Sequence, residues 1–179
     1  VIAQYGTQEQ RRRWLPGLAD GTATYAFGIT EPDAGSNSHH LATTATRTED
    51  GWVLTGGKTF ISGVDEASHV LVVGRTSDSR AGKLEPALFM VPTDAEGFTR
   101  QEIEMGLTSP EKQFTLFFDD LRLPADALVG SDHAGLEQLF AGFPQLGSNF
   151  VGRELADFFR SHDRVLGWMR LRRSCRRAG

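Results

Sequence analysis

The chain has 179 residues, of which 39% are hydrophobic and 23% charged, and its formal net charge is −4 at pH 7. This composition fits one folded domain with small attachments and excludes an intrinsically disordered chain. The weak acidity gives no support for a nucleic-acid partner or for binding to an anionic membrane surface. We expect no membrane segment, because no apolar run reaches the ~18 residues that a span requires. The single cysteine, Cys175, excludes an internal disulfide framework and favours a reducing, cytoplasmic location.

The charge is distributed unevenly along the chain. Residues 1–150 contain 11 basic and 20 acidic residues, whereas residues 151–179 contain eight arginines, no lysine and three acidic residues. The two segments therefore differ in net charge and in their use of lysine and arginine.

The first residues of the chain read as the end of a helical element. Thr7 and Gln10 have the spacing of a capping box, in which each side chain binds a backbone amide of the other residue. Helix-forming residues follow from Glu9 to Leu15, and we expect Pro16-Gly17 to interrupt the helix.

Residues 22–126 carry strand and turn signals without helical patterns between them. We expect turns at Asp50-Gly51 and at Gly56-Gly57. The predicted strands cover Tyr25–Thr30, Ala42–Thr48, Trp52–Thr55, Lys58–Ser62, His69–Gly74, Ala87–Val91 and Gln113–Phe118. This spacing predicts a mainly β domain, an antiparallel β-barrel or sandwich with helices only at its flanks. A helical pattern begins again at Gly135–Ala141.

Two apparent motifs carry no chemistry. Gly56-Gly57-Lys58-Thr59 resembles part of a phosphate-binding loop, but Trp52 stands where that loop needs its first glycine, and a tight hairpin turn explains the sequence better. The neighbouring His39 and His40 would point to opposite faces of a strand, so they cannot chelate one metal ion together, and we expect no metal site.

Two other stretches could hold a flat, polar ligand. In Phe27–Asn37 a strand stops at a proline and continues into a loop of small residues, in which Thr30 and Ser36 offer hydroxyl groups. In the second stretch, alternation places Phe60 and Ser62 on one face of a strand and Ile61 on the other, so an aromatic ring lies beside a hydroxyl. Taken alone, the first stretch is explained by an ordinary turn. The second is explained by a phenylalanine in the core beside a serine whose hydroxyl is hydrogen-bonded within the protein.

Taken together and in order, the motifs resemble the acyl-CoA dehydrogenase family. They are YGTQEQRRRWLPGLADG, FGITEPDAGSN, GWVLTGGKTFIS, FFDDLRLP and LVG, and the resemblance covers roughly residues 4–142. It implies the end of the N-terminal helical domain in residues 1–21, the β-barrel middle domain that binds FAD and acyl-CoA in residues 22–126, and a truncated or divergent C-terminal helical segment in residues 127–179.

The resemblance also implies a set of FAD-binding residues. Thr30 would contact the polar edge of the flavin, Phe60 would pack against its ring, and the Ser62 hydroxyl would bond near N5. Ser36 would reach both the FAD pyrophosphate and the CoA part of the substrate. The full set of implied cofactor residues is Phe27, Ile29, Thr30, Gly35, Ser36, Phe60, Ile61 and Ser62.

The implied reaction is the α,β-dehydrogenation of an acyl-CoA, with hydride transfer to flavin N5 and electron transfer to an electron-transferring flavoprotein. Members of the family form homodimers or homotetramers. Phe60 stands where many members have tryptophan, and Asn37 stands where aspartate is common. An acyl-CoA oxidase or a flavin monooxygenase would have the same domain plan, and a non-catalytic flavin- or acyl-CoA-binding remnant is a further alternative.

The C-terminal part departs from the family. The family's catalytic base lies on a C-terminal helical domain that has no counterpart here, so we assign no catalytic residue, and Glu154, Asp157 and Asp163 receive no role. The resemblance stops after Ala141-Gly142, shortly before the arginine-rich, lysine-free composition begins. A reading-frame change or a gene truncation would produce this pattern, as would an unusual genuine tail, and we favour the former as a hypothesis.

Overall fold

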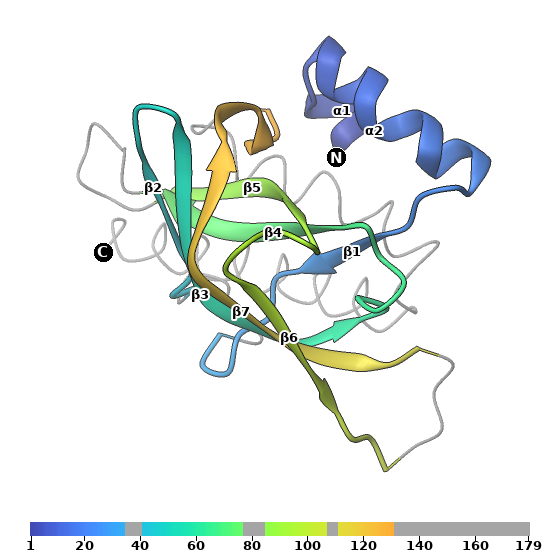
Figure 1. The fold of residues 1–179 in the computed structure, drawn as a ribbon, viewed down its shortest axis with the longest axis vertical. Coiled ribbons are helices and arrows are strands. Elements are labelled where there is room, and N and C mark those ends of the chain that lie inside the picture. The colour runs from blue at the N-terminus through green and yellow to red at the C-terminus, as the bar shows by residue number, and fades with distance from the viewer. Residues whose placement is uncertain (35–40, 77–84, 107–110, 131–179) are drawn as a thin grey trace, which may run out of the picture. The chain divides into compact units, whose positions relative to one another are not determined.

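The structure is a computed structural model that describes residues 1–34, 41–76, 85–106 and 111–130 (Figure 1). All of them belong to the first of two compact units, Val1–Gln138. The predictions made for Gly35 and Ser36, for the helical pattern at 135–141 and for the arginine-rich tail lie outside the described residues. Within the described part of the chain, no helix is long and apolar enough to cross a membrane.

Two helices open the chain, α1 (Ile2–Tyr5) and α2 (Gln8–Asp20). The predicted capping box is confirmed, since the Thr7 side chain accepts from the Gln10 amide and the Gln10 side chain accepts from the Thr7 amide. The predicted interruption at Pro16 is wrong, because α2 continues through it to Asp20. The helix ends instead at Gly21, whose φ of 76° provides the left-handed cap that a glycine adopts easily.

The described residues form a seven-stranded sheet in which one strand, β5, pairs with β4 outside the main strand order. Its strands are β1 (Tyr25–Gly28), β2 (Thr44–Arg47), β3 (Gly51–Ser62), β4 (His69–Thr76), β5 (Glu85–Pro92), β6 (Phe98–Ile103) and β7 (Gln113–Pro124), followed by a 3-10 turn at Ala125–Ala127. The hydrogen-bonded order is β1-β4-β2-β3-β7-β6, with β5 on β4. The mainly β fold with helices at the flank is therefore confirmed.

The sheet is mixed, which corrects the purely antiparallel arrangement expected from strand spacing. β4 pairs in parallel with β1 along His69–Val72 and with β2 at Arg75 and Thr76, while β5 pairs antiparallel with it along its whole length. β1 and β2 thus share one edge of β4. Spacing along the chain predicts strands but not their partners, so these parallel contacts became visible only in the folded sheet.

Strand β3 is the long element that positions the candidate site. It runs without a turn through Gly56-Gly57, where a hairpin turn was predicted, and pairs with β7 along most of its length. The two glycines permit close packing, because a Cβ at Gly56 would lie 2.7 Å from the Thr43 Cα and one at Gly57 would lie 2.8 Å from the Leu116 carbonyl oxygen. The pairing with β7 shifts register twice, between Leu54 and Gly56 and between Lys58 and Ile61.

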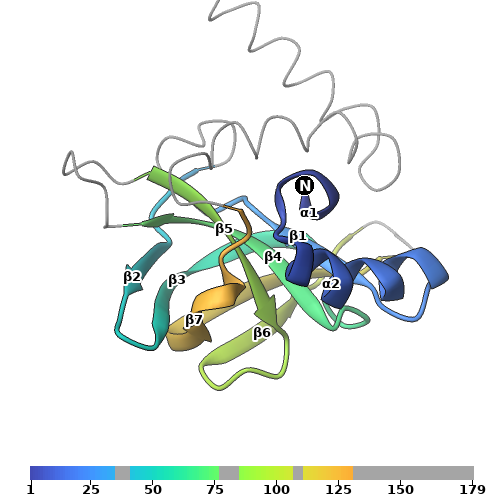
Figure 2. The same cartoon turned by 90° about the horizontal axis from the view of Figure 1, so that it is seen from above.

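The apolar core lies on one face of the curled sheet. Trp52, Leu54, Phe89, Leu116 and Leu121 are among its almost fully buried side chains. The helices lie near the β1, β4 and β5 part of the sheet and away from β6 (Figure 2).

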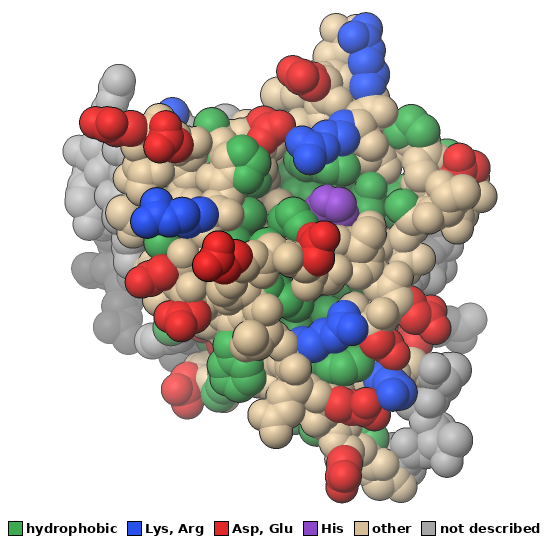
Figure 3. All heavy atoms as spheres, in the orientation of Figure 1, with side chains coloured by type: hydrophobic (Ala, Val, Ile, Leu, Met, Phe, Trp, Pro, Cys, Tyr) green, Lys and Arg blue, Asp and Glu red, His purple; other side chains and the backbone are tan. Residues whose placement is uncertain are grey.

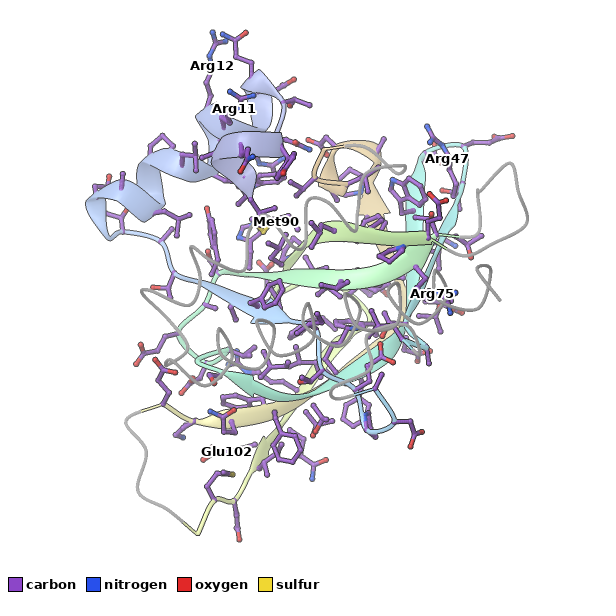
Figure 4. The ribbon with its side chains drawn as sticks, turned by 180° about the vertical axis from the view of Figure 1, so that it is seen from behind. Arg11, Arg12, Arg47, Arg75, Met90 and Glu102 are labelled. Carbon is purple, nitrogen blue, oxygen red and sulfur yellow. The ribbon has the colours of Figure 1, made fainter. Side chains whose placement is uncertain are left out.

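Hydrogen bonds hold α2 in that place. The Gln10 side chain donates to the carbonyl oxygens of Asp126 and Leu128 at 2.8 and 2.7 Å, and the Tyr25 hydroxyl donates to the Trp14 carbonyl oxygen. Seen from behind, Arg11 and Arg12 point away from the sheet, whereas the buried Met90 lies between the helices and the strands (Figure 4).

Candidate functional site

A β-bulge in β3 exposes Phe60. Its side chain is 60% exposed, although the neighbouring Ile61 is only 2% exposed and packs in the core. Phe60 has a φ of 57°, a conformation that bulky residues rarely adopt and that costs about 1–3 kcal/mol. A bulge that turns one side chain out of the regular alternation is common next to binding sites. The local backbone strain and the exposed ring together mark Phe60 as a residue placed for contact with something outside the sheet.

The two stretches singled out from the sequence meet at this bulge. The Thr59 amide donates to the Thr30 carbonyl oxygen at 2.9 Å, and the Thr30 hydroxyl donates in return to the Thr59 carbonyl oxygen. The chain that continues β1 is therefore tied to β3 one residue before Phe60. Because its proton is used in this bond, the Thr30 hydroxyl can still accept a hydrogen bond from a ligand.

A buried ion pair lies directly behind this contact. The Lys58 ammonium donates to a carboxylate oxygen of Glu31 at 2.7 Å and to the Ile29 carbonyl oxygen at 3.2 Å. The Lys58 side chain is fully buried and that of Glu31 is 5% exposed. Glu31 also accepts from the amides of Ala42 and Thr43 and from the Thr43 hydroxyl, at 2.6, 3.1 and 2.6 Å. The pair thus joins three separate segments, and all four donors converge on one carboxylate.

The environment shifts the pKa values of both partners. Burial by itself raises the pKa of Glu31, but the hydrogen bonds from Lys58, Thr43 and Ala42 outweigh it and hold the pKa below its usual value. Burial lowers the pKa of Lys58 to about 8, although the Glu31 carboxylate acts in the opposite direction. Glu31 is therefore ionised at neutral pH, and the hydrogen bonds to its carboxylate are the strong, charge-assisted kind.

Ser62 lies two residues beyond Phe60 and is half-buried. Its hydroxyl accepts a hydrogen bond from the Gln113 side-chain amide at 2.7 Å, across the β3–β7 pair in which the two residues are direct partners. On the same face of the sheet, the Thr59 and Thr115 hydroxyls lie 3.4 Å apart. The bulge is thus bordered by a row of hydroxyl and amide groups, which suits a flat ligand that needs both stacking and hydrogen bonds at its edge.

The structure brings together most, but not all, of the predicted site residues. Phe27 is half-buried on β1 and pairs with Leu71, and the Ile29 carbonyl oxygen is bound by Lys58. The Ile61 side chain belongs to the core, so it can contact a ligand only through its backbone. Thr30 lies beside the strand that carries Phe60, whereas Gly35 and Ser36 lie outside the described residues.

Three residues of the site were missed by the sequence analysis: Glu31, Lys58 and Gln113. Glu31 and Lys58 stand inside quoted motifs and Gln113 begins a predicted strand, but nothing local shows that Lys58 is buried or which residue it pairs with. A lysine between Gly57 and Thr59 looks like an exposed hairpin residue until the fold places it over Glu31.

The face shown in Figure 3 carries no concentrated charge. Its Lys and Arg side chains lie apart from one another and are interspersed with acidic ones. In the part of the chain that the structure describes, no group of three or more His, Cys, Asp and Glu residues could hold a metal ion.

The chain has relatives among known proteins. Residues 26–121 match the middle domain of acyl-CoA dehydrogenases. The acyl-CoA dehydrogenase FadE12 of Mycobacterium tuberculosis is 61% identical over 142 residues, which are 79% of this chain and 37% of that protein.

Solved structures give the same result. A glutaryl-CoA dehydrogenase from Mycobacterium smegmatis in complex with FADH2 is 39% identical with a TM-score of 0.65, over 72% of this chain and 32% of that one. The ChsE4–ChsE5 complex from Mycobacterium tuberculosis is 32% identical with a TM-score of 0.71, over 78% of this chain and 36% of that one.

This chain therefore spans about a third of the length of the relatives that it matches. The matched residues include the strands that carry the bulge at Phe60, the ion pair of Lys58 and the Ser62–Gln113 contact. The chain belongs to the acyl-CoA dehydrogenase family, and its curled β-sheet is the middle domain of that family.

Proposed function

We propose that this chain is the flavin-binding part of an enzyme that dehydrogenates acyl-CoA thioesters at their α and β carbons, with FAD as cofactor. The observation that carries the proposal is the strained, 60% exposed Phe60 beside the Ser62 hydroxyl. A structural role does not explain why a large aromatic side chain is turned out of a sheet at a cost in backbone strain. The similar glutaryl-CoA dehydrogenase from Mycobacterium smegmatis, which was solved in complex with FADH2, supports the choice of cofactor.

The residues of the bulge fit a flavin ring. Phe60 would supply the apolar surface against which the ring packs, and Ser62 would bond to its edge close to N5. Thr30 would accept a hydrogen bond, because its proton is already given to the Thr59 carbonyl oxygen. Gly35 remains a predicted cofactor-binding residue, and Ser36 remains the predicted contact to both the FAD pyrophosphate and the CoA part of the substrate.

The bound flavin would supply the hydride acceptor for the β-hydrogen, and the chain's own residues hold and orient it. Removal of the α-proton needs a carboxylate positioned near the substrate, and the described residues at the bulge provide none, since Glu31 is buried under Lys58. We therefore place the base in a part of the full enzyme beyond the described residues. An acyl-CoA substrate, an electron-transferring flavoprotein as electron acceptor, a homodimeric or homotetrameric assembly and a cytoplasmic location complete the proposal.

The test is an FAD titration of the isotopically labelled chain followed by NMR, which measures weak binding. We expect weak, saturable binding that shifts the amides of Phe60 and Ser62, because one wall of the flavin site lies outside this domain. Phe60→Ala should weaken binding about 3- to 10-fold, since aromatic contacts contribute about 0.5–1.5 kcal/mol. Because the ring is exposed, the same variant should leave the thermal midpoint unchanged.

An acyl-CoA panel with an artificial electron acceptor completes the test. Without a positioned base we expect no turnover by the chain alone, because general-base catalysis contributes about 10²–10⁴ in rate. Turnover near 1 s⁻¹, an ordinary rate for an enzyme, would contradict the assignment of the base to another part of the enzyme. An FAD affinity that Phe60→Ala leaves unchanged would contradict the assignment of the flavin site.

A further inference from the structure

The contact between Ser62 and Gln113 fixes the direction of a proton. A hydroxyl has one proton and two acceptor positions, while a side-chain amide nitrogen only donates. Because Gln113 donates to the Ser62 oxygen at 2.7 Å, it fills one acceptor position and leaves the hydroxyl proton for another partner. Among the residues that the structure describes, Gln113 is the sole hydrogen-bond partner of this hydroxyl.

The backbone holds this pair in place. Ser62 and Gln113 are direct neighbours in the antiparallel register of β3 and β7, and the Gly63 amide donates to the Lys112 carbonyl oxygen at 3.0 Å immediately beside them. Gln113 itself pairs with Ile103 on its other side. The amide group thus stands on an interior strand of the sheet, whose backbone is bonded on both sides.

We propose that Gln113 is a positioning residue of the site at Phe60, which makes the Ser62 hydroxyl a hydrogen-bond donor toward a ligand that lies on the exposed ring. The inference rests on the proposed function and deepens it. An oxidised flavin presents acceptors, its N5 and the adjacent carbonyl oxygen, along one edge. A hydroxyl held as a donor matches that edge, whereas a freely turning hydroxyl would have to be ordered on binding.

The test uses two variants of Gln113. Gln113→Glu has nearly the same shape but only accepts, so it takes the Ser62 proton for itself and reverses the bond. Gln113→Met removes the donor and leaves the hydroxyl free to turn. In the FAD titration by NMR, we expect Gln113→Glu to weaken binding about 3- to 10-fold and Gln113→Met about 2- to 3-fold, the range of one hydrogen bond.

The same variants are then made on a Ser62→Ala background, which separates positioning from other effects. If Gln113 acts through the Ser62 proton, both substitutions lose their effect on FAD affinity in that background. A general loss of structure, or repulsion between the new carboxylate and the FAD phosphates, would weaken binding equally in both backgrounds and would overturn the inference. An unchanged affinity of Gln113→Glu would overturn it as well.

Failure of the flavin site has a different signature. If the chain shows no saturable shift with FAD, or if Phe60→Ala and Ser62→Ala both bind FAD as tightly as the unmodified chain, the proposed function fails and the role of Gln113 fails with it. If those two variants bind FAD more weakly while Gln113→Glu does not, the flavin site stands and only the role of Gln113 is wrong.

Discussion

The buried pair of Lys58 and Glu31 makes Lys58→Met the most informative substitution for the fold. The Lys58 side chain is fully buried, and its removal leaves the Glu31 carboxylate with three remaining donors but no cation. Breaking a buried ion pair by removing one partner costs about 3–5 kcal/mol. In a chain of this size each kcal/mol shifts the thermal midpoint by about 2–4 °C, so the fall should be roughly 6–20 °C.

Two controls make this prediction specific. Lys112→Met removes the cation of the exposed pair with Glu102 and should leave the midpoint unchanged, because surface pairs are screened by solvent. The double variant Glu31→Gln with Lys58→Met removes both charges and should be more stable than Lys58→Met alone, since no unpaired carboxylate remains. The measurement is thermal unfolding by circular dichroism at pH 7. A double variant less stable than Lys58→Met would refute the reasoning, as would a loss of less than about 1 kcal/mol for Lys58→Met, the size of an exposed pair.

Three further predictions concern the same framework. Because the folded pKa of Glu31 lies below its unfolded value of 4.5, its stabilisation is present above pH 4.5 and is lost as the pH falls through the folded pKa; acid titration of stability should therefore be shallower for Glu31→Gln, and equal slopes would contradict this. Gln10→Ala removes two hydrogen bonds to the carbonyl oxygens of Asp126 and Leu128. The free energy that protects the α2 amides from exchange should therefore fall by about 1–3 kcal/mol, while the protection of β3 stays unchanged. A uniform loss of protection would argue against a local role. Gly51→Ala places a Cβ 2.1 Å from the Leu123 carbonyl oxygen and should cost at least about 1–3 kcal/mol in urea denaturation, whereas Gly21→Ala, with no atom within 4 Å of its Cβ, should cost less; the reverse order would refute the steric argument.

The sequence by itself determined the features that depend on neighbouring residues. The capping box of Thr7 and Gln10 needs a spacing of three residues. Adjacent strand residues face opposite sides, so Phe60 was expected to lie opposite Ile61, but the bulge that exposes Phe60 belongs to the folded sheet. The apolar strands β4 and β5 were also predicted in place, because hydrophobic runs bounded by turn residues are local signals. The order of the family's motifs along the chain also indicated the acyl-CoA dehydrogenase middle domain.

Some local signals gave the wrong answer because packing overrode them. Gly56-Gly57 looks like a turn, but in the sheet these glycines allow Thr43 and the backbone of β7 to approach closely. Strand β6 was missed because its central residues are polar and exposed, as on a sheet edge, and its pairing with β7 is made by the backbone.

The tertiary structure alone decided the chemistry of the site. Glu31 meets Lys58 across 27 positions and Ser62 meets Gln113 across 51, and in both cases the register of strands distant in sequence brings the side chains together. The parallel pairing of β1 with β4 and the bond between Thr30 and Thr59 likewise join segments that no short window of sequence contains. The sequence shows which chemical groups are present, but their burial and hydrogen-bond partners are properties of the folded sheet. These properties determine which group is charged and which hydrogen bonds are already made.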